Sequence, residues 1–192
     1  LYLADVSITE KQTTPEPETP VVENLYTNGA FVPAAGAETG TDFALATTLG
    51  ADFSWYLLNR DQVTWSLEKN TEHGNALKVT SKKNDNIRLR HANISWENGK
   101  TYVVSYWIKA SENSFREFFP LITSGTTINY NTNNDVVARN VTAEWKQVTF
   151  EYTADGTTDT GIVDFMFNGY TDDCLYLADV SITEKQTTPE PE

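Results

Sequence analysis

The residues best suited to chemistry in this sequence are aromatic side chains that stand beside acids, amides or an arginine. Trp65 and Glu68 lie three residues apart in a stretch whose other members are mostly polar. An aromatic face stacks on flat patches of C–H groups, and a carboxylate accepts hydrogen bonds from hydroxyls. The pair therefore suits a neutral ligand rich in hydroxyl groups. The alternative is that Trp65 packs in the core and contacts no ligand.

A second group of candidates follows a long apolar stretch, at Phe115, Arg116 and Phe118. Alternation along an extended chain places Arg116 and Phe118 on one face, so a fork of N–H donors would lie beside an aromatic ring. The other interpretation is a surface arginine next to a core phenylalanine. Tyr130 lies among several asparagines, in a loop that either borders a ligand or is a solvated turn. Asn168 is the last candidate, at the end of a row predicted to face outward.

Short strands must position these side chains. From Asn24 onward, alternating apolar and polar runs are separated by turn signals such as Asn28-Gly29 and Asp155-Gly156, and no stretch keeps a helical period for three turns. Many strands at this spacing predict an all-β fold, a two-sheet antiparallel β-sandwich or jelly roll. Strands are predicted at 25–31, 63–69, 76–81, 86–91, 101–110, 116–123, 146–152, 162–168 and 175–183.

Alternation also assigns the faces of two strands. In 101–110 the residues predicted to be core are Tyr102, Val104, Tyr106 and Ile108, and those predicted to face away are Val103, Ser105, Trp107 and Lys109. In 162–168 the predicted core residues are Val163, Phe165 and Phe167, which turns Asp164, Met166 and Asn168 outward. These outward rows would line a groove if their sheet is curved.

Residues 1–18 recur without change at 175–192. Each copy begins with the alternating strand signal LYLADVSIT and continues with EKQTTPEPE, whose polar, proline-rich composition is typical of an extended linker. We interpret 1–23 as a duplicated terminal strand with its linker, 24–185 as one β-sandwich and 186–192 as a second linker. Residues 175–183 should fill the sandwich, and residues 1–9 should lie outside it. The alternative is an artefact of the chain's preparation.

Charge and composition argue against several classes of partner. The chain carries 14 Lys and Arg against 27 Asp and Glu, a formal net charge of −13. Such a surface repels phosphate, so nucleic acids and anionic membranes are poor partners, whereas a neutral ligand is unaffected. The alternative is that the acidity only keeps the protein soluble. The single cysteine, Cys174, and two histidines show no zinc-binding spacing.

No apolar run approaches the roughly 20 residues of a membrane span, and no secretory leader opens the sequence. We therefore expect any signal peptide to lie outside this fragment.

Five stretches in the body of the chain, in this order and spacing, resemble a known family. They are NLYTNGAF at 24–31, HGNALKV at 73–79, GKTYVVSYWIKA at 99–110, WKQVTF at 145–150 and LYLADVSI at 175–182. Together they resemble the carbohydrate-binding modules of families four, nine and twenty-two.

The resemblance implies a jelly roll whose concave sheet binds a β-linked polysaccharide, with xylan first and β-glucan next. It implies a non-catalytic module attached to a xylanase or glucanase, with tandem modules common, in a secreted, periplasmic or cell-surface bacterial setting. It also implies that an aromatic ring in the strand of Trp65 stacks on sugar, and that Trp145 packs in the core.

The resemblance further implies a structural calcium ion near the first strand. Asp179 is the residue expected to supply a carboxylate, with Asn24 or Glu23 beside it, because hard oxygen ligands suit calcium. The chain has Phe31-Val32 where many relatives have Phe-Glu, and this departure removes one possible ligand.

Two other classes of function stay open. A glycosidase or lyase on the same sandwich would need two carboxylates about 5 to 10 Å apart, and no spacing of acids such as Glu68 and Glu117 marks such a pair. No nucleophile elbow, phosphate loop or catalytic-cysteine motif occurs. The third class is a structural or adhesion sandwich that binds no sugar. It should bury Trp65 and Phe118, whereas a binder exposes at least one of them.

Overall fold

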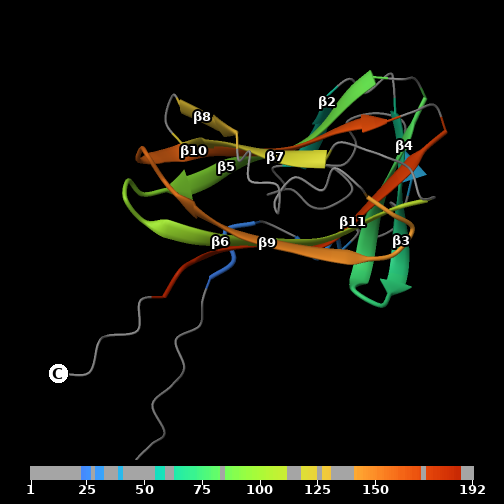
Figure 1. The fold of residues 1–192 in the computed structure, drawn as a ribbon, viewed down its shortest axis with the longest axis horizontal. Helices are drawn as coiled ribbons and strands as arrows, with labels where there is room; N and C mark the ends of the chain where they lie inside the picture. The colour runs from blue at the N-terminus through green and yellow to red at the C-terminus, as the bar shows by residue number, and fades with distance from the viewer. Residues whose placement is uncertain are drawn as a thin grey trace, which may run out of the picture.

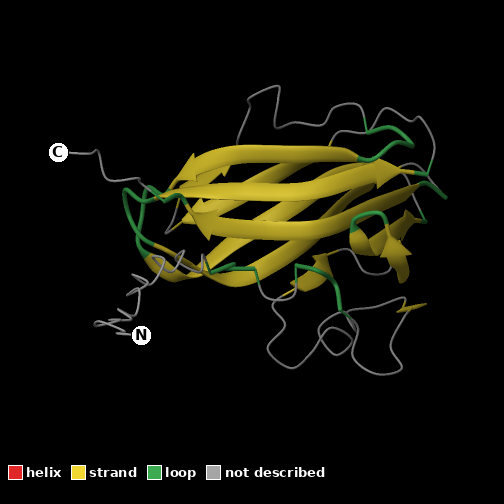
Figure 2. Cartoon of the chain, turned by 90° about the horizontal axis from the view of Figure 1, so that it is seen from below, coloured by secondary structure: helices red, strands yellow, loops and turns green. Residues whose placement is uncertain are grey.

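The computed structural model describes residues 23–26, 29–32, 39–40, 55–58, 63–82, 85–111, 118–124, 127–130, 141–169 and 172–186. Within these ranges the chain folds into strands, turns and loops, as the strands drawn in yellow in Figure 2 show. In the same ranges no helix is long and apolar enough to cross a membrane. The predicted all-β fold is confirmed.

The described strands form two antiparallel sheets that face one another (Figure 1). The six-stranded sheet has the order β1 (Thr39–Gly40), β3 (Val63–Thr71), β4 (Gly74–Ser81), β11 (Cys174–Glu184), β6 (Thr101–Ala110) and β9 (Lys146–Thr153). The five-stranded sheet has the order β2 (Trp55–Leu58), β5 (Asp85–Trp96), β10 (Thr158–Gly169), β7 (Phe118–Ser124) and β8 (Thr127–Tyr130).

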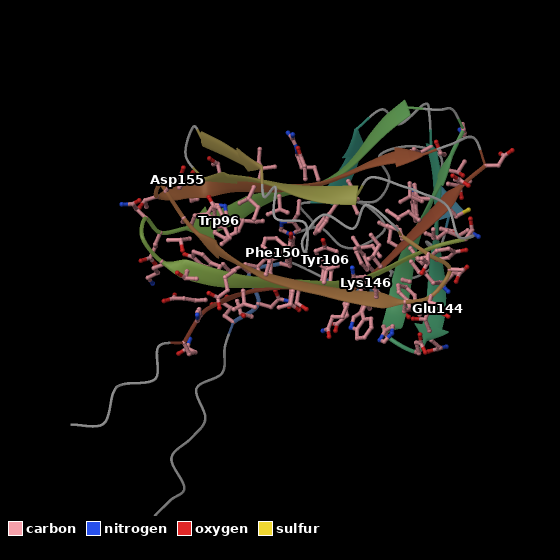
Figure 3. All side chains as sticks on the ribbon, in the orientation of Figure 1. Trp96, Tyr106, Glu144, Lys146, Phe150 and Asp155 are labelled. Carbon is pink, nitrogen blue, oxygen red and sulfur yellow. The ribbon has the colours of Figure 1, made fainter. Side chains whose placement is uncertain are left out.

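The core lies between the sheets and is built by strand alternation. In β6 every second side chain is buried, as predicted, because successive residues of a strand point to opposite faces. Tyr106 from the six-stranded sheet packs edge-on against Phe165 from the five-stranded sheet, with ring centroids 5.2 Å apart. Trp96, Tyr106 and Phe150 point into the space between the sheets (Figure 3). These aromatic contacts join the two layers.

Eight of the nine predicted strand ranges correspond to observed strands, but β5 runs five residues further and β10 begins four residues earlier than predicted. The predicted strand at 25–31 is wrong, because its described residues are not assigned to any strand. This segment nevertheless runs beside β11: the Leu25 amide donates to the Ile182 carbonyl at 2.8 Å, and the Val180 amide donates to the Gly29 carbonyl at 3.0 Å. The strands β1, β2 and β8 escaped prediction because alternation is not recognisable over two to four residues.

The duplicated strand signal at 175–183 lies in β11, between β4 and β6, as expected. Its register against β6 shifts between Ala178 and Ser181, which marks a β-bulge, and Asp179 within it has φ 45°. The first copy, at 1–9, lies outside the described residues.

Candidate functional site

Trp65 does not present its ring to a ligand. It is 2% exposed and lies on the core side of β3, together with Val63 and Leu67. Its predicted role as an exposed stacking ring is therefore wrong. Because Glu68 occupies the opposite parity on the strand, it lies on the other face, where its carboxylate is 3.8 Å from Lys78 Nζ. Alternation between Val63 and Leu67 was the sequence signal that placed Trp65 inside.

Three of the other predicted site residues lie on strands of the five-stranded sheet. Phe118 begins β7, Tyr130 ends β8 and Asn168 lies near the end of β10. The structure describes these three by their backbone alone, so their predicted contacts stay predictions. Phe115 and Arg116 lie outside the described residues.

Hydrogen-bonded pairing brings five positions into one row across the whole five-stranded sheet. The Cα partners run from β2 to β8 in the order Tyr56, Arg90, Asp164, Leu121 and Tyr130. The row therefore has a tyrosine position on each outer strand and an ion pair at its centre. Only Tyr130 of this row was a sequence candidate.

Arg90 and Asp164 form a two-pronged ion pair. Arg90 Nε donates to Asp164 Oδ1 at 2.5 Å, and Nη2 donates to Oδ2 at 2.6 Å. Asp164 alternates with the core residues Val163 and Phe165, so it points away from the core as predicted, yet its exposure is only 4%. The predicted outward direction is thus confirmed, and the low exposure shows that other groups cover the side chain, because alternation fixes the face of a residue and not what covers it.

The pair supplies a planar, fixed group of N–H donors. A guanidinium held by two parallel hydrogen bonds loses little freedom when it meets a further acceptor, and its flat face also suits stacking. The Arg90 side chain is 21% exposed, so part of it reaches the surface of the sheet. The row can therefore hold a neutral, hydroxyl-bearing ligand by donors at its centre.

Asn24, one of the two residues predicted to hold calcium, is hydrogen-bonded to backbone groups instead. Asn24 Oδ1 accepts hydrogen bonds from the Tyr26 amide at 3.0 Å and the Ile182 amide at 2.9 Å, and Nδ2 donates to the Val180 carbonyl. Both lone pairs of this oxygen are engaged, so the Asn24 side chain does not fit the role of a calcium ligand. Asp179 is exposed, and among the described residues no group of three or more His, Cys, Asp or Glu could hold a metal ion.

Trp145 is not the core residue that was expected. It is partly exposed on the outer face of the six-stranded sheet, where its ring meets His73 edge-on at 5.3 Å and lies under Lys109 Nζ at 4.9 Å. Sequence reasoning had no signal for this, because Trp145 precedes β9 and has no alternation of its own.

Comparison with protein families gives one match over most of the body of the chain. Residues 53–173 match a family described as a carbohydrate binding domain. This span begins before β2 and ends just before β11, so it contains every residue of the Tyr56–Tyr130 row. A search of curated proteins finds no match to this chain.

Solved structures share the fold at low sequence identity. The N-terminal cellulose-binding domain of Cellulomonas fimi β-1,4-glucanase C is 21% identical, with a TM-score of 0.50 over 70% of this chain and 91% of that one. The CBM22-1 xylan-binding domain of Paenibacillus barcinonensis Xyn10C is 10% identical, with a TM-score of 0.52 over 70% and 88%. TmCBM61, solved with β-1,4-galactotriose, is 14% identical, with a TM-score of 0.55 over 85% and 99%.

Proposed function

The chain belongs to the carbohydrate binding domain family, and we propose that it binds a β-linked polysaccharide across the face of the five-stranded sheet that points away from the core. The module binds and does not catalyse, as its family and its structural neighbours indicate. Xylan is the proposed first ligand and β-glucan the second.

The observation that supports this face is the central ion pair of the Tyr56–Tyr130 row. Sugar hydroxyls need planar polar partners, and the Arg90 guanidinium, fixed by Asp164, is such a partner in the middle of the sheet. Tyrosine positions on the two outer strands add aromatic residues at either end of the row. A polysaccharide chain lying along the row would pass all three.

The choice of xylan or β-glucan rests on likeness alone. The similar structures described above are named for xylan binding, for cellulose binding and for a complex with β-1,4-galactotriose. All three support a polysaccharide as ligand, and they do not agree on one sugar. Resemblance of the strand motifs to modules of families four, nine and twenty-two places xylan first.

Affinity electrophoresis and calorimetric titration test the proposal together. Migration of the chain should be retarded in gels that contain soluble xylan or mixed-linkage β-glucan, and titration with xylohexaose or cellohexaose should give saturable heat. Arg90→Lys keeps the charge but loses the two-pronged geometry, so it should weaken binding by about tenfold.

The matched control is Thr149→Ala, an exposed position on the six-stranded sheet, and it should bind as the parent chain does. Normal migration in every polysaccharide gel, with no heat from either oligosaccharide, would contradict the proposal.

The proposed biological role is to hold a linked catalytic domain, a xylanase or glucanase, on its substrate. Tethering raises the effective concentration of substrate at the linked domain without any new contact there. The proline-rich EKQTTPEPE segment has the composition of a linker between modules, and a secreted bacterial enzyme is the proposed setting. Fusion to a xylanase should speed hydrolysis of insoluble xylan, and Arg90→Lys in the fusion should reduce that gain.

A spacer that binds no sugar is the second candidate, and one observation favours it. Trp65 is buried, as a spacer requires, and Phe118 is described by its backbone alone. The two candidates differ in the titration: a spacer gives no heat with any oligosaccharide.

Calcium at Asp179 is a separate proposal, without Asn24 as a ligand. Its support is the exposed carboxylate in the bulge of β11. Adding calcium chloride to chelator-treated protein should raise the melting temperature, and Asp179→Asn should abolish the rise. A melting temperature that calcium leaves unchanged would contradict the proposal.

A further inference from the structure

The outer face of the six-stranded sheet carries a layer of rings. Ala76, Ala178 and Trp107 are Cα partners in one row of this face, and both alanines are 0% exposed although they point away from the core. Larger side chains must therefore cover this part of the sheet. His73, from the turn between β3 and β4, stacks on Trp107 with ring centroids 3.6 Å apart and planes within 11°.

Trp145 extends this layer of rings toward the first residue of β9. Its ring meets His73 edge-on, with centroids 5.3 Å apart, and meets Tyr176 in the same manner at 6.4 Å. Lys109 Nζ lies 4.9 Å from the Trp145 centroid and 4.8 Å from the Tyr176 centroid, so a cation sits between the two rings. The Trp145 ring is thus held from several sides, and the residue as a whole is partly exposed.

A shallow, wide-open hollow of about 710 Å³ lies beside Trp145. Figure 3 shows Glu144 at this end of the molecule, near the hairpin of β3 and β4. Small-molecule sites commonly have volumes of about 300–1,000 Å³, so this hollow has room for one or two sugar rings. The residues that line it are Glu68, Lys69, Thr71, Glu72, Lys109, Ala143, Glu144 and Trp145.

The side chains that line the hollow determine which class of ligand it can bind. Three carboxylates accept hydrogen bonds, two ammonium groups and one hydroxyl donate them, and an indole offers a flat apolar surface. Carboxylates outnumber ammonium groups, so an anionic ligand would be repelled, and the mostly polar lining does not suit an apolar peptide. A saccharide has both the flat C–H faces and the hydroxyls that this mixture fits.

We propose that this hollow is a second saccharide-binding site, on the opposite side of the molecule from the Arg90 row, with Trp145 as its stacking ring and Lys109 and Glu144 as its hydroxyl partners. The proposal rests on the proposed function for the class of ligand, but not for the location. His73 meets the Trp145 ring edge-on and is itself stacked on Trp107, and neither His73 nor Trp107 lines the hollow. Two sites on opposite faces would let one module contact two polysaccharide chains.

Calorimetric titration of the full chain with xylohexaose and cellohexaose tests the proposal by stoichiometry. We expect two sites per chain in the parent and one site in Trp145→Ala, with its melting temperature checked for folding. Glu144→Gln, at an exposed position that packing does not need, should weaken one of the two sites by about fivefold to tenfold, because a neutral amide oxygen accepts a weaker hydrogen bond than a carboxylate does. In NMR spectra the sugar should shift one indole resonance, identified as Trp145 because Trp145→Phe removes it.

The failures of the two proposals are distinguishable. One site per chain, lost in Arg90→Lys and unaffected by Glu144→Gln and Trp145→Ala, would overturn the second site and keep the first. One site that Glu144→Gln weakens and Arg90→Lys spares would keep the hollow and overturn the location proposed for the five-stranded sheet. No heat from either oligosaccharide would overturn both.

Discussion

Asp164 occupies a position between two core residues of β10, where alternation predicts a side chain that points away from the core. It does so, yet it is nearly inaccessible and fixes Arg90 by two hydrogen bonds. The sequence pattern predicted the direction of this side chain correctly, because direction depends on parity along the strand. Its partner and its cover depend on residues distant in sequence, and no local pattern carries that information.

Trp65 shows how a family resemblance can mislead about one residue. The strand at 63–69 was predicted correctly, yet the aromatic ring within it belongs to the core face. Local alternation, which successfully assigned the core of β6, was the better guide at this position.

Removing the charge of Asp164 should destabilise the fold. Asp164→Asn leaves the partly buried Arg90 guanidinium without its carboxylate, and breaking such a pair costs about 3 kcal/mol in the free energy of unfolding. Urea unfolding followed by far-ultraviolet circular dichroism measures the change. Asp159→Asn, at an exposed position in the same strand, is the control, and equal stability of the two variants would show that the pair contributes nothing.

Asn24 should contribute to stability as a side-chain clamp on β11. Asn24→Ala removes three hydrogen bonds to backbone groups, each worth about 1 kcal/mol before allowance for exposure, so we expect a loss of about 2 kcal/mol. The same urea titration measures it. The adjacent exposed Glu23, changed to Gln, should leave the midpoint where it is; a shift as large as that of Asn24→Ala would argue against the clamp.

At the scale of elements, the long strands could be predicted from sequence and the short ones could not. The range 101–110 was predicted to the residue, because ten residues of alternation leave one interpretation. β2 and β8 hold four residues each, yet they carry the tyrosine positions of the candidate row. The site was therefore harder to predict than the fold, because its ends lie on the elements with the weakest signals.

The close approach of β5 and β10 near Gly161 leads to a prediction about packing between strands. A methyl group at Gly161 would meet the Trp96 indole and the Ile94 carbonyl, so Gly161→Ala should reduce the free energy of unfolding by about 1–3 kcal/mol. Chemical unfolding monitored by tryptophan fluorescence measures this. Thr160→Ala, at the adjacent exposed position, should leave the free energy of unfolding nearly unchanged. The same result for Gly161→Ala would show that the two strands can move apart there without loss of stability.

At the scale of the whole molecule, the two sheets enclose a core that contains phenols. Burial raises the pKa of the Tyr26 phenol well above its ordinary value, and electrostatic interaction with Tyr106 and Asp164 raises it further. Burial raises the pKa of Tyr106 as well. Both phenols therefore stay protonated in the folded protein at the pH values at which the tyrosines of the unfolded chain begin to lose their protons.

Stability should consequently fall in alkali. The unfolded tyrosines lose their protons near the ordinary pKa of about 10, while the folded ones keep theirs, so rising pH favours unfolding from that point upward. Tyr106→Phe should move the midpoint of alkaline unfolding to higher pH, as measured by circular dichroism during a pH titration. An unchanged midpoint in this variant would contradict the role given to its burial.

The central claim, that a polysaccharide lies across the outer face of the five-stranded sheet, is tested most directly by NMR. Titration of isotope-labelled protein with xylohexaose, and separately with cellohexaose, reports which backbone amides change. We predict that the largest chemical-shift changes occur at amides of β5, β10 and β7 around Arg90 and Asp164. The amide resonances of β9 residues such as Thr149 should not shift. Shifts confined to the six-stranded sheet, or no shift with either sugar, would contradict the claim.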